Sequence, residues 1–279
     1  MEGRVAPRVV DMPRTLTAAS IQQQLADGLG VHPGLSVIAH VSLEALGPVE
    51  GGAEAVAAAI TAAAGTVVMP AFTYQTQVIP QTGPPNNALV YGSGDTLNGR
   101  ADIFRADLPV HPDCGSVAET LRRHPATLRS LHPILSFVAQ GPQARSVLAS
   151  QTSHNPLGPI AWLEAHDGAV LLMGLDQRHN FSLHLAEQRA GRRTFTRWAL
   201  TVDAIEELHG IPGCMEGFNA VWPELMPFTT VAQIGMARCE LIPLRLLLAY
   251  VEERLCADPN FMLCDKPGCL SCRAREVWR

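Results

Sequence analysis

The chain alternates between helical and extended patterns of apolar residues. Residues 17–29 carry apolar side chains at helical spacing, and Thr17 is a favourable residue at a helix N-terminus. The segments LSVIAHV (35–41) and TVVMP (66–70) are short and apolar, which is typical of buried strands. The alanine-rich segment 51–64 between them predicts a helix. A strand, a glycine-containing turn, a helix and a second strand in this order indicate a βαβ unit.

These patterns continue on either side of one long irregular segment. Residues 71–113 contain five prolines, and a loop of this length inside a compact domain is usually functional. Beyond it, further helices and strands are expected at 115–123, 136–140, 169–174, 181–189 and 243–256. No linker rich in proline, glycine or serine divides the chain. We therefore expect one layered α/β domain over residues 1–279, with 257–279 as a cysteine-rich tail.

Composition and charge exclude several classes of protein. With 47% hydrophobic and 17% charged residues, the chain is neither disordered nor a coiled coil. Its apolar runs, such as 246–250, are far shorter than the roughly 20 residues that a membrane span needs. Residues 1–13 mix acidic, basic and proline residues, so we expect no signal peptide and a cytoplasmic location. The formal net charge of −5 disfavours nucleic acid as a partner and favours a cationic substrate.

The turn after the first predicted strand is a candidate phosphate site. Its sequence is HVSLEALGPVEGG (40–52). A glycine-rich turn that opens a helix presents free backbone N–H groups and the positive end of the helix dipole, and both bind phosphates. Because the spacing matches neither GxGxxG nor a Walker loop, a tight turn with a helix cap is the alternative.

His184 and Glu187 are candidates for acid–base chemistry. They stand three residues apart in a predicted helix and so share one face. A carboxylate near an imidazole raises its basicity and fixes its tautomer. The pair follows the predicted strand 169–174, and α/β proteins place their sites at the carboxyl ends of strands. Because HxxE is common by chance, a solvated helical pair is the alternative.

Two further motifs leave alternatives open. His132 precedes a proline in an extended or turning segment, where it either contacts a ligand or bonds to the loop backbone.

Cys264, Cys269 and Cys272 lie within nine residues and resemble a zinc knuckle, with Cys256 or a histidine as the fourth ligand. Such a zinc site would stabilise the tail and take no part in catalysis. Free or redox-labile thiols are the alternative.

Taken in order, six segments carry a resemblance: HVSLEALGPVEGGAEAV (40–56), GTVVMPAFT (65–73), CGSVAETLRRHP (114–125), RSLHPILSFVAQG (129–141), NPLG (155–158) and LLMGLDQRHNFSLHLAE (171–187). In this order and spacing they resemble the aminoglycoside 3-N-acetyltransferase family. The resemblance covers about residues 15–255. It implies a single α/β/α domain, distinct from the GNAT fold, with long loops that form a deep cleft. It also implies that an acetyl group passes from acetyl-CoA to an amine.

The resemblance also implies roles for particular residues. His184 matches the catalytic histidine, Glu187 belongs to its motif, and Glu119 matches a carboxylate that faces the cleft. Contacts with CoA are implied for seven residues: Val41, Ser42, Leu43, Gly47, Thr73, Ser116 and Val117. Contacts with the acceptor are expected from four others: Tyr74, His132, Asp176 and Asn180.

The chain departs from the family pattern at three places. Val41 stands where the family usually has serine, and Cys114 stands where it usually has methionine. Arg178 replaces an aspartate two residues before Asn180, although Asp176 is nearby. An arginine would repel a polycation, so this departure bears on the substrate more than on the chemistry.

We therefore expect His184 to deprotonate the substrate ammonium, with Glu187 or Glu119 orienting the imidazole. A backbone N–H or a hydroxyl such as that of Thr73 would stabilise the oxyanion. Direct attack by the amine needs no acyl-enzyme, although Cys114 leaves a ping-pong route open.

The predicted function is acetylation of the 3-amino group of an aminoglycoside. The alternatives are another small amine as acceptor, and a CoA-binding or zinc-organised protein without catalysis. A serine hydrolase is disfavoured because the sequence has no G-x-S-x-G elbow. The sequence gives no indication of oligomeric state.

Overall fold

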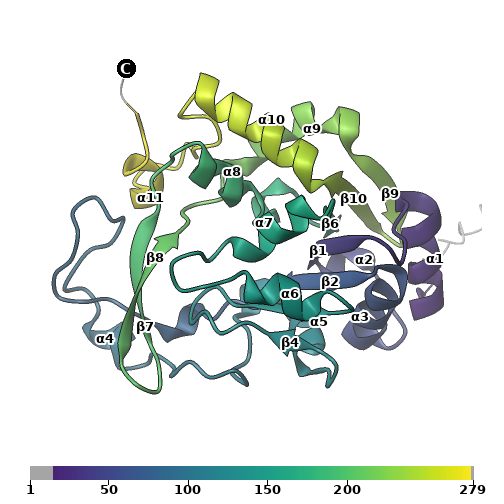
Figure 1. The fold of residues 1–279 in the computed structure, drawn as a ribbon, viewed down its shortest axis with the longest axis horizontal. Coiled ribbons are helices and arrows are strands. Elements are labelled where there is room, and N and C mark those ends of the chain that lie inside the picture. The colour runs from purple at the N-terminus through teal and green to yellow at the C-terminus, as the bar shows by residue number, and fades with distance from the viewer. Residues whose placement is uncertain (1–14, 278–279) are drawn as a thin grey trace, which may run out of the picture.

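The computed structural model describes residues 15–277, and its centre is a mixed seven-stranded sheet (Figure 1). The strand order is β4-β5-β2-β1-β6-β10-β9. The three parallel strands are β1 (Ser36–Val41), β2 (Thr66–Pro70) and β6 (Ala169–Met173). The antiparallel strands are β4 (Leu128–Arg129), β5 (Phe137–Gln140), β9 (Thr230–Ile234) and β10 (Ala237–Pro243). The parallel centre contains the predicted βαβ unit.

Helices cover both faces of this sheet, which confirms the predicted layered α/β fold (Figure 1). One face packs against α1 (Ala18–Leu29), α3 (Gly52–Ala63) and α5 (Gly115–Arg123). The other packs against α6 (Ala144–Ala149), α7 (Gly158–Ala165), α8 (Leu183–Arg189) and α10 (Leu244–Ala257). Strand side chains alternate between the two cores, so Val37 packs on the first side and Ile38 on the second.

The long segment 71–113 lies beside the main sheet and is irregular for most of its length, as predicted. It contains α4 (Asp95–Asn98) and the short strand β3 (Gln77–Val78). β3 pairs with β7 (Phe195–Leu200), which pairs with β8 (Ile205–Ile211) in a second sheet. We did not predict the β7–β8 hairpin, because only Leu208 and Ile211 are buried along β8 and no apolar run marks it.

Three short helices complete the described fold: α2 (Leu43–Leu46), α9 (Trp222–Leu225) and α11 (Leu270–Arg273). None of the described helices is long and apolar enough to cross a membrane. The expectation of no signal peptide concerns residues 1–13, which lie outside the described residues. The assignment of residues 1–279 to one domain stays a prediction.

Candidate active site

The parallel strands β1, β2 and β6 end at one edge of the main sheet, and the loops that follow carry most of the predicted site residues. The loop after β1 joins the end of β6 directly, because the Ser42 N–H donates to the Met173 carbonyl at 2.9 Å. The start of α5 packs against the same loop, since a Cβ on Gly115 would lie 3.3 Å from the Val41 carbonyl oxygen. The fold therefore gathers distant motifs at the edge where α/β proteins place their sites.

His184 and Glu187 contact each other inside α8. The His184 Nδ1 lies 2.6 Å from the Glu187 Oε2, and the two side chains are 0% and 4% exposed. The imidazole packs between the rings of Phe181 and Phe218, each with its centroid 4.9 Å away. The pair is therefore buried, and the alternative of a solvated helical pair is wrong.

Two arginines complete the surroundings of Glu187. The Arg192 Nη1 donates to Oε1 at 2.6 Å, and the Arg275 Nη1 donates to both carboxylate oxygens at 3.0 Å. Burial alone would raise the pKa of Glu187. The hydrogen bond from His184 and the charges around the carboxylate outweigh burial and lower this pKa from 4.5 to about 2. Glu187 is therefore an anion at neutral pH.

An ionised Glu187 fixes the tautomer of His184. The carboxylate accepts the Nδ1 proton, so Nε2 carries the lone pair of a neutral imidazole. Burial lowers the pKa of His184 below its ordinary 6.5, although the hydrogen bond to Glu187 opposes that shift. Nε2 is buried and has no hydrogen-bond partner among the described residues. This nitrogen is chemically suited to accept a proton at neutral pH.

A chain of buried polar groups begins at Asn180, four residues before His184. The Asn180 Nδ2 donates to the Gln177 Oε1 at 2.9 Å, and the Gln177 Nε2 donates to the Glu240 Oε2 at 2.9 Å. His40, at the end of β1, is also buried, and burial lowers its pKa to about 3, helped by the nearby His179. In the described residues, the Asn180 Oδ1 and the His40 Nε2 have no partner. Both atoms are buried, as the His184 Nε2 is.

The turn after β1 is built around Ser42 and Gly47. The Ser42 hydroxyl caps α2 by accepting the Ala45 N–H at 3.2 Å. Gly47 has φ +82°, and a Cβ there would lie 2.7 Å from the Met236 Sδ, so only glycine fits. Leu43 is half-buried, which leaves part of the turn accessible. Of the other predicted CoA contacts, Ser116 is exposed at the start of α5, whereas Val41 and Val117 are core residues.

Thr73 and His132 hold the loop backbone together. The Thr73 hydroxyl is buried and donates to the Pro133 carbonyl at 2.6 Å, so the prediction that it stabilises an oxyanion is wrong for this arrangement. The His132 Nδ1 accepts the N–H groups of Ile134 and Leu135 at 3.2 and 3.0 Å. Burial lowers the pKa of His132 to about 4. His132 thus bonds to the loop backbone, which is the structural alternative given above, and its buried Nε2 stays unpartnered among the described residues.

Glu119 does not reach His184. Its carboxylate pairs with Arg122 at 2.7 Å and accepts the Val110 N–H at 3.1 Å. The ion pair lies within α5, whereas the bond from Val110 and a bond from the Arg122 Nη1 to the Asp107 carbonyl at 3.0 Å hold α5 against the end of the long segment 71–113. The alternative in which Glu119 orients the imidazole is therefore wrong, and Glu187 occupies that position.

Cys114 and Tyr74 lie next to each other at this edge. Burial raises the pKa of the Cys114 thiol to about 12, with the Asp113 charge adding to the shift. Burial also raises the pKa of Tyr74, with a contribution from Cys114. Tyr74 packs against His111 with a centroid distance of 5.2 Å. A thiol that stays protonated is a poor nucleophile.

We therefore expect Cys114→Ala to keep most of the wild-type turnover, because a protonated thiol offers no thiolate for an acyl-enzyme. Steady-state kinetics with both substrates varied would check this, and the expected pattern is intersecting lines. Parallel lines together with an acetylated Cys114 in the mass spectrum of quenched enzyme would contradict it.

Asp176 and Arg178 form an ion pair at 2.7 Å on the loop after β6. Asn219 also donates to Asp176, at 2.9 Å. Burial opposes ionisation of Asp176, but the bonds from Arg178 and Asn219 lower its pKa to about 2. The carboxylate is ionised, and its charge is neutralised by its own neighbour.

The three cysteines of the tail form a cluster with a fourth cysteine that was not the one expected. The ligand atoms of Cys214, Cys264, Cys269 and Cys272 all lie within 4.8 Å of one another. Cys256 is exposed on α10 and outside this group, so the prediction of Cys256 or a histidine as the fourth member is wrong. Cys214 precedes the other three by 50 residues or more, and no local spacing marks it.

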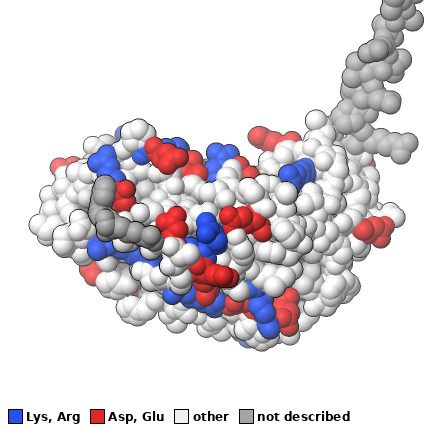
Figure 2. Space-filling view, turned by 90° about the horizontal axis from the view of Figure 1, so that it is seen from above, with Lys and Arg blue, Asp and Glu red and all other residues white. Residues whose placement is uncertain are grey.

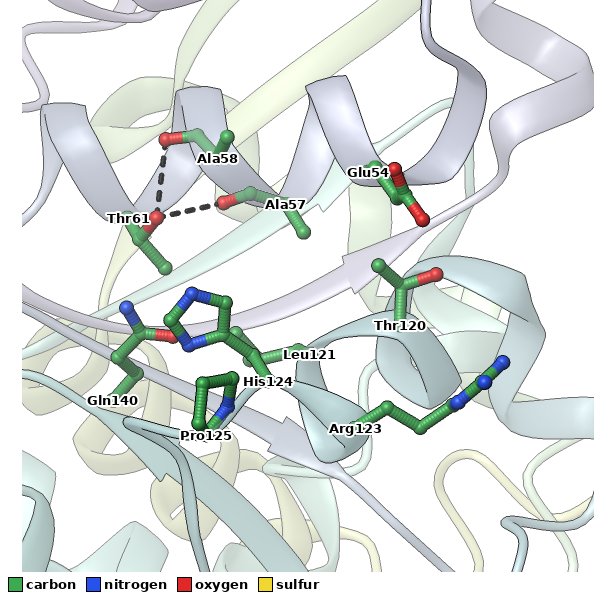
Figure 3. A pocket seen from close by; sticks show the side chains of 10 residues that line it. All are labelled: Glu54, Ala57, Ala58, Thr61, Thr120, Leu121, Arg123, His124, Pro125 and Gln140. Atoms are coloured by element: carbon green, nitrogen blue, oxygen red, sulfur yellow. Dashed lines mark hydrogen bonds between the residues drawn. The ribbon is translucent and has the colours of Figure 1, made fainter.

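A groove of about 500 Å³ between α3 and α5 contains none of the predicted site residues (Figure 3). Figure 3 shows Glu54 and Arg123 at one end of it and Gln140 at the other. The Thr61 hydroxyl bonds to the carbonyls of Ala57 and Ala58 in its own helix. The groove lies along the helix layer and is not the cleft implied by the resemblance.

The structure thus combines a mixed sheet between two helical layers with a buried His–Glu pair beyond its parallel strands. The family model of aminoglycoside 3-N-acetyltransferases matches residues 38–255, and the chain belongs to that family. Aminoglycoside N(3)-acetyltransferase IV of Salmonella sp is 34% identical over 267 residues, which cover 90% of this chain and 93% of that protein. The YokD protein of Bacillus subtilis is 32% identical over 187 residues, which cover 62% of this chain and 65% of that protein.

Solved structures agree with this assignment. The apoenzyme of aminoglycoside acetyltransferase AAC(3)-IVa superposes with a TM-score of 0.77 at 28% identity, covering 95% of this chain and 98% of that one. A mutant of the same enzyme in complex with a gentamicin gives a TM-score of 0.76 at 27% identity, with the same coverage. The protein is thus an aminoglycoside 3-N-acetyltransferase-like acyltransferase.

Our sequence reasoning missed the residues that surround the His–Glu pair. Arg192 lies five positions after Glu187, and Arg275 lies 88 positions after it, so neither spacing marks a contact. Gln177 and Glu240 were also missed, although Gln177 lies within the segment that resembles the family. His40 belongs to the predicted phosphate-binding turn, but the sequence pattern assigns it no role of its own.

Proposed function

We propose that this protein transfers the acetyl group of acetyl-CoA to the 3-amino group of an aminoglycoside, with His184 as the general base. The observation that carries the proposal is the His184 Nε2, which has no hydrogen-bond partner within residues 15–277 and belongs to an imidazole kept neutral by burial and oriented by the ionised Glu187. The proposal includes a cytoplasmic location, as the sequence predicts.

In the proposed reaction, Nε2 takes a proton from the substrate ammonium and frees the nitrogen lone pair. The amine then attacks the thioester carbonyl carbon, and the carbon–sulfur bond breaks as the tetrahedral intermediate collapses. The imidazolium returns its proton to the leaving sulfur, and the second amine proton passes to solvent. Glu187 stabilises the imidazolium through the 2.6 Å bond to Nδ1. General-base help of this kind accelerates a reaction by about 10² to 10⁴.

Access to Nε2 requires a local movement, because the His184 side chain is 0% exposed. The two rings that enclose it belong to Phe181, just before α8, and to the turn 218–221 between β8 and β9. Phe218 lies one residue before Asn219, which bonds to Asp176. Binding of the acceptor at Asp176 would therefore disturb the same turn that covers the imidazole.

The likeness to an enzyme solved with a gentamicin supports a cationic amine as the acceptor. Figure 2 shows acidic and basic side chains mixed over the face seen from above, so no field of one sign covers that face. Local carboxylates would therefore attract the substrate, and Asp176 is the accessible candidate. Because Asp176 forms an ion pair with Arg178, little net negative charge remains there. Amines with fewer amino groups are therefore the second candidate class of acceptor.

Acetyl-CoA is expected to bind and to raise the melting temperature. The reason is the segment from Val41 to Gly47, which contains the short helix α2 and follows β1 at the edge where phosphate-binding turns lie. A ligand at about 100 times its Kd stabilises the native state by about 2.7 kcal/mol. Thermal scans with and without acetyl-CoA check this, with calorimetry for the Kd. Unchanged melting at saturating acetyl-CoA would contradict the proposed co-substrate.

A thiol-release assay with acetyl-CoA tests the proposed function directly. The acceptor panel contains gentamicin, sisomicin, a linear polyamine and a monoamino sugar. Release of CoA with the aminoglycosides, and a product acetylated at the 3-amino group by NMR, is the expected result. Release of CoA only with the smaller amines would show that the acceptor is not an aminoglycoside, while the proposed acetyl transfer would stand.

A further inference from the structure

Four sulfur atoms from two distant parts of the chain meet beside α11. Cys214 lies in the loop after β8, and Cys264, Cys269 and Cys272 lie in the C-terminal tail, which Figure 1 shows next to the end of β8. The Sγ atoms of Cys214 and Cys264 are 3.8 Å apart, and all four lie within 4.8 Å of one another. Zinc–sulfur bonds of about 2.3 Å in a tetrahedron separate the sulfurs by about 3.8 Å.

Backbone groups support thiolate character at this cluster. The Glu216 N–H donates to the Cys214 Sγ, and the Cys264 N–H donates to the Cys272 Sγ, both at 3.4 Å. N–H groups directed at sulfur stabilise thiolate ligands. Gly268, at φ +82°, turns the chain so that Cys264 comes back to the CxxC hook.

The same tail reaches the proposed active site through Arg275. This arginine follows Cys272 by three residues, and its side chain is 1% exposed. Its Nη1 donates to both oxygens of Glu187 at 3.0 Å, while its Nη2 donates to the Cys214 carbonyl at 3.0 Å and lies 3.8 Å from the Cys272 Sγ. The guanidinium thus joins the cysteine cluster to the carboxylate that orients His184.

We propose that Cys214, Cys264, Cys269 and Cys272 bind one Zn²⁺ and that this site holds Arg275 against Glu187. Each thiol releases its proton to solvent on binding, and no electron is transferred. Four protein ligands close the coordination sphere, so the metal organises structure and does not contact the substrate. Arg275 is a positioning residue that acts through Glu187. This proposal, which rests on the proposed role of His184, replaces the expectation that the tail takes no part in acetyl transfer.

Metal content and cobalt substitution test the site without any activity measurement. Protein purified without a metal-affinity column is expected to contain one zinc per chain, and Co²⁺ exchanged into it to give the absorption bands of a tetrahedral thiolate site. A chelator is expected to lower the Tm by about 5 °C or more. Cys269→Ser should lose the zinc, whereas Cys256→Ser, an exposed cysteine outside the cluster, should keep it. Substoichiometric zinc, or disulfides among these cysteines by mass spectrometry, would overturn the site.

Arg275 is tested with Arg275→Ala, Arg275→Lys and the exposed control Arg273→Ala. We expect Arg275→Ala to keep its zinc and its affinity for acetyl-CoA but to lose at least about tenfold in kcat, with the acceptor KM within about twofold. Guanidinium added to Arg275→Ala should restore part of the lost kcat. The kcat of Arg275→Lys should lie between those of Arg275→Ala and wild type. If Arg275→Ala matches Arg273→Ala in kcat, the positioning role is refuted while the zinc site stands. If wild type acetylates no acceptor, the proposed function fails. The positioning role is then tested by NMR: the imidazole signals of His184 should differ between wild type and Arg275→Ala if Arg275 positions Glu187, and unchanged signals would refute that role.

Discussion

His184→Ala is expected to lower kcat by about 10² to 10⁴ while leaving the Kd of acetyl-CoA unchanged. In the proposed mechanism the imidazole accepts a proton in the transition state. It belongs to α8, whereas the turn that is proposed to hold the cofactor follows β1. A loss confined to kcat would identify an interaction made only in the transition state. Steady-state kinetics together with calorimetric titration of acetyl-CoA measure the two quantities separately.

His184→Asn separates catalysis from structure. The asparagine amide can still donate to Glu187 from a position near that of Nδ1, but nothing replaces Nε2. This variant should keep a melting temperature closer to that of wild type than the alanine variant and lose as much kcat. The exposed His209→Ala serves as the control. Turnover of His184→Asn within twofold of wild type would remove His184 from the mechanism.

The parallel strands at the centre of the fold could be predicted from the chain because they are buried on both faces. β1, β2 and β6 are runs of apolar residues, and such runs are visible without knowledge of their partners. The exposed sides of β8 and β9 mix polar residues with the apolar Ile205 and Val231, so no alternating pattern marks these strands. Their positions depend on pairing with neighbouring strands. Local pattern contains little information about that pairing.

The His–Glu contact could be predicted for a similar reason, because three residues along a helix place two side chains together. The contacts of Glu187 with Arg192 and Arg275 depend on how the chain returns after α8 and after α10, which no spacing encodes. Cys214 joins the cysteine cluster in the same way, from a loop 50 residues before Cys264. The contact between His184 and Glu187 therefore follows from local sequence, whereas the contacts of Glu187 with the two arginines depend on long-range packing.

Glu187→Gln is expected to destabilise the protein by about 3 to 5 kcal/mol at pH 7, because it leaves two buried cations without their anion. The Arg192 and Arg275 side chains are 4% and 1% exposed, so water cannot replace the lost charge. Glu164→Gln is the matched control. Glu164 pairs with Arg189 at 2.6 Å near the surface, where removal of an ion pair costs about 0 to 1 kcal/mol. Denaturant unfolding of both variants and wild type measures the difference.

The pH dependence of the same experiment identifies the charge as the cause. The pKa of Glu187 is about 2 in the native state, against 4.5 for an ordinary glutamate. Its stabilising contribution is therefore fully present above about pH 4.5 and is lost as the pH falls toward 2. The stability gap between wild type and Glu187→Gln should narrow over that range, and the gap for Glu164→Gln should stay small throughout. A Glu187→Gln variant within 1 kcal/mol of wild type at pH 7 would show that the two arginines find other partners, and the expected electrostatic contribution of Glu187 to stability would then be wrong.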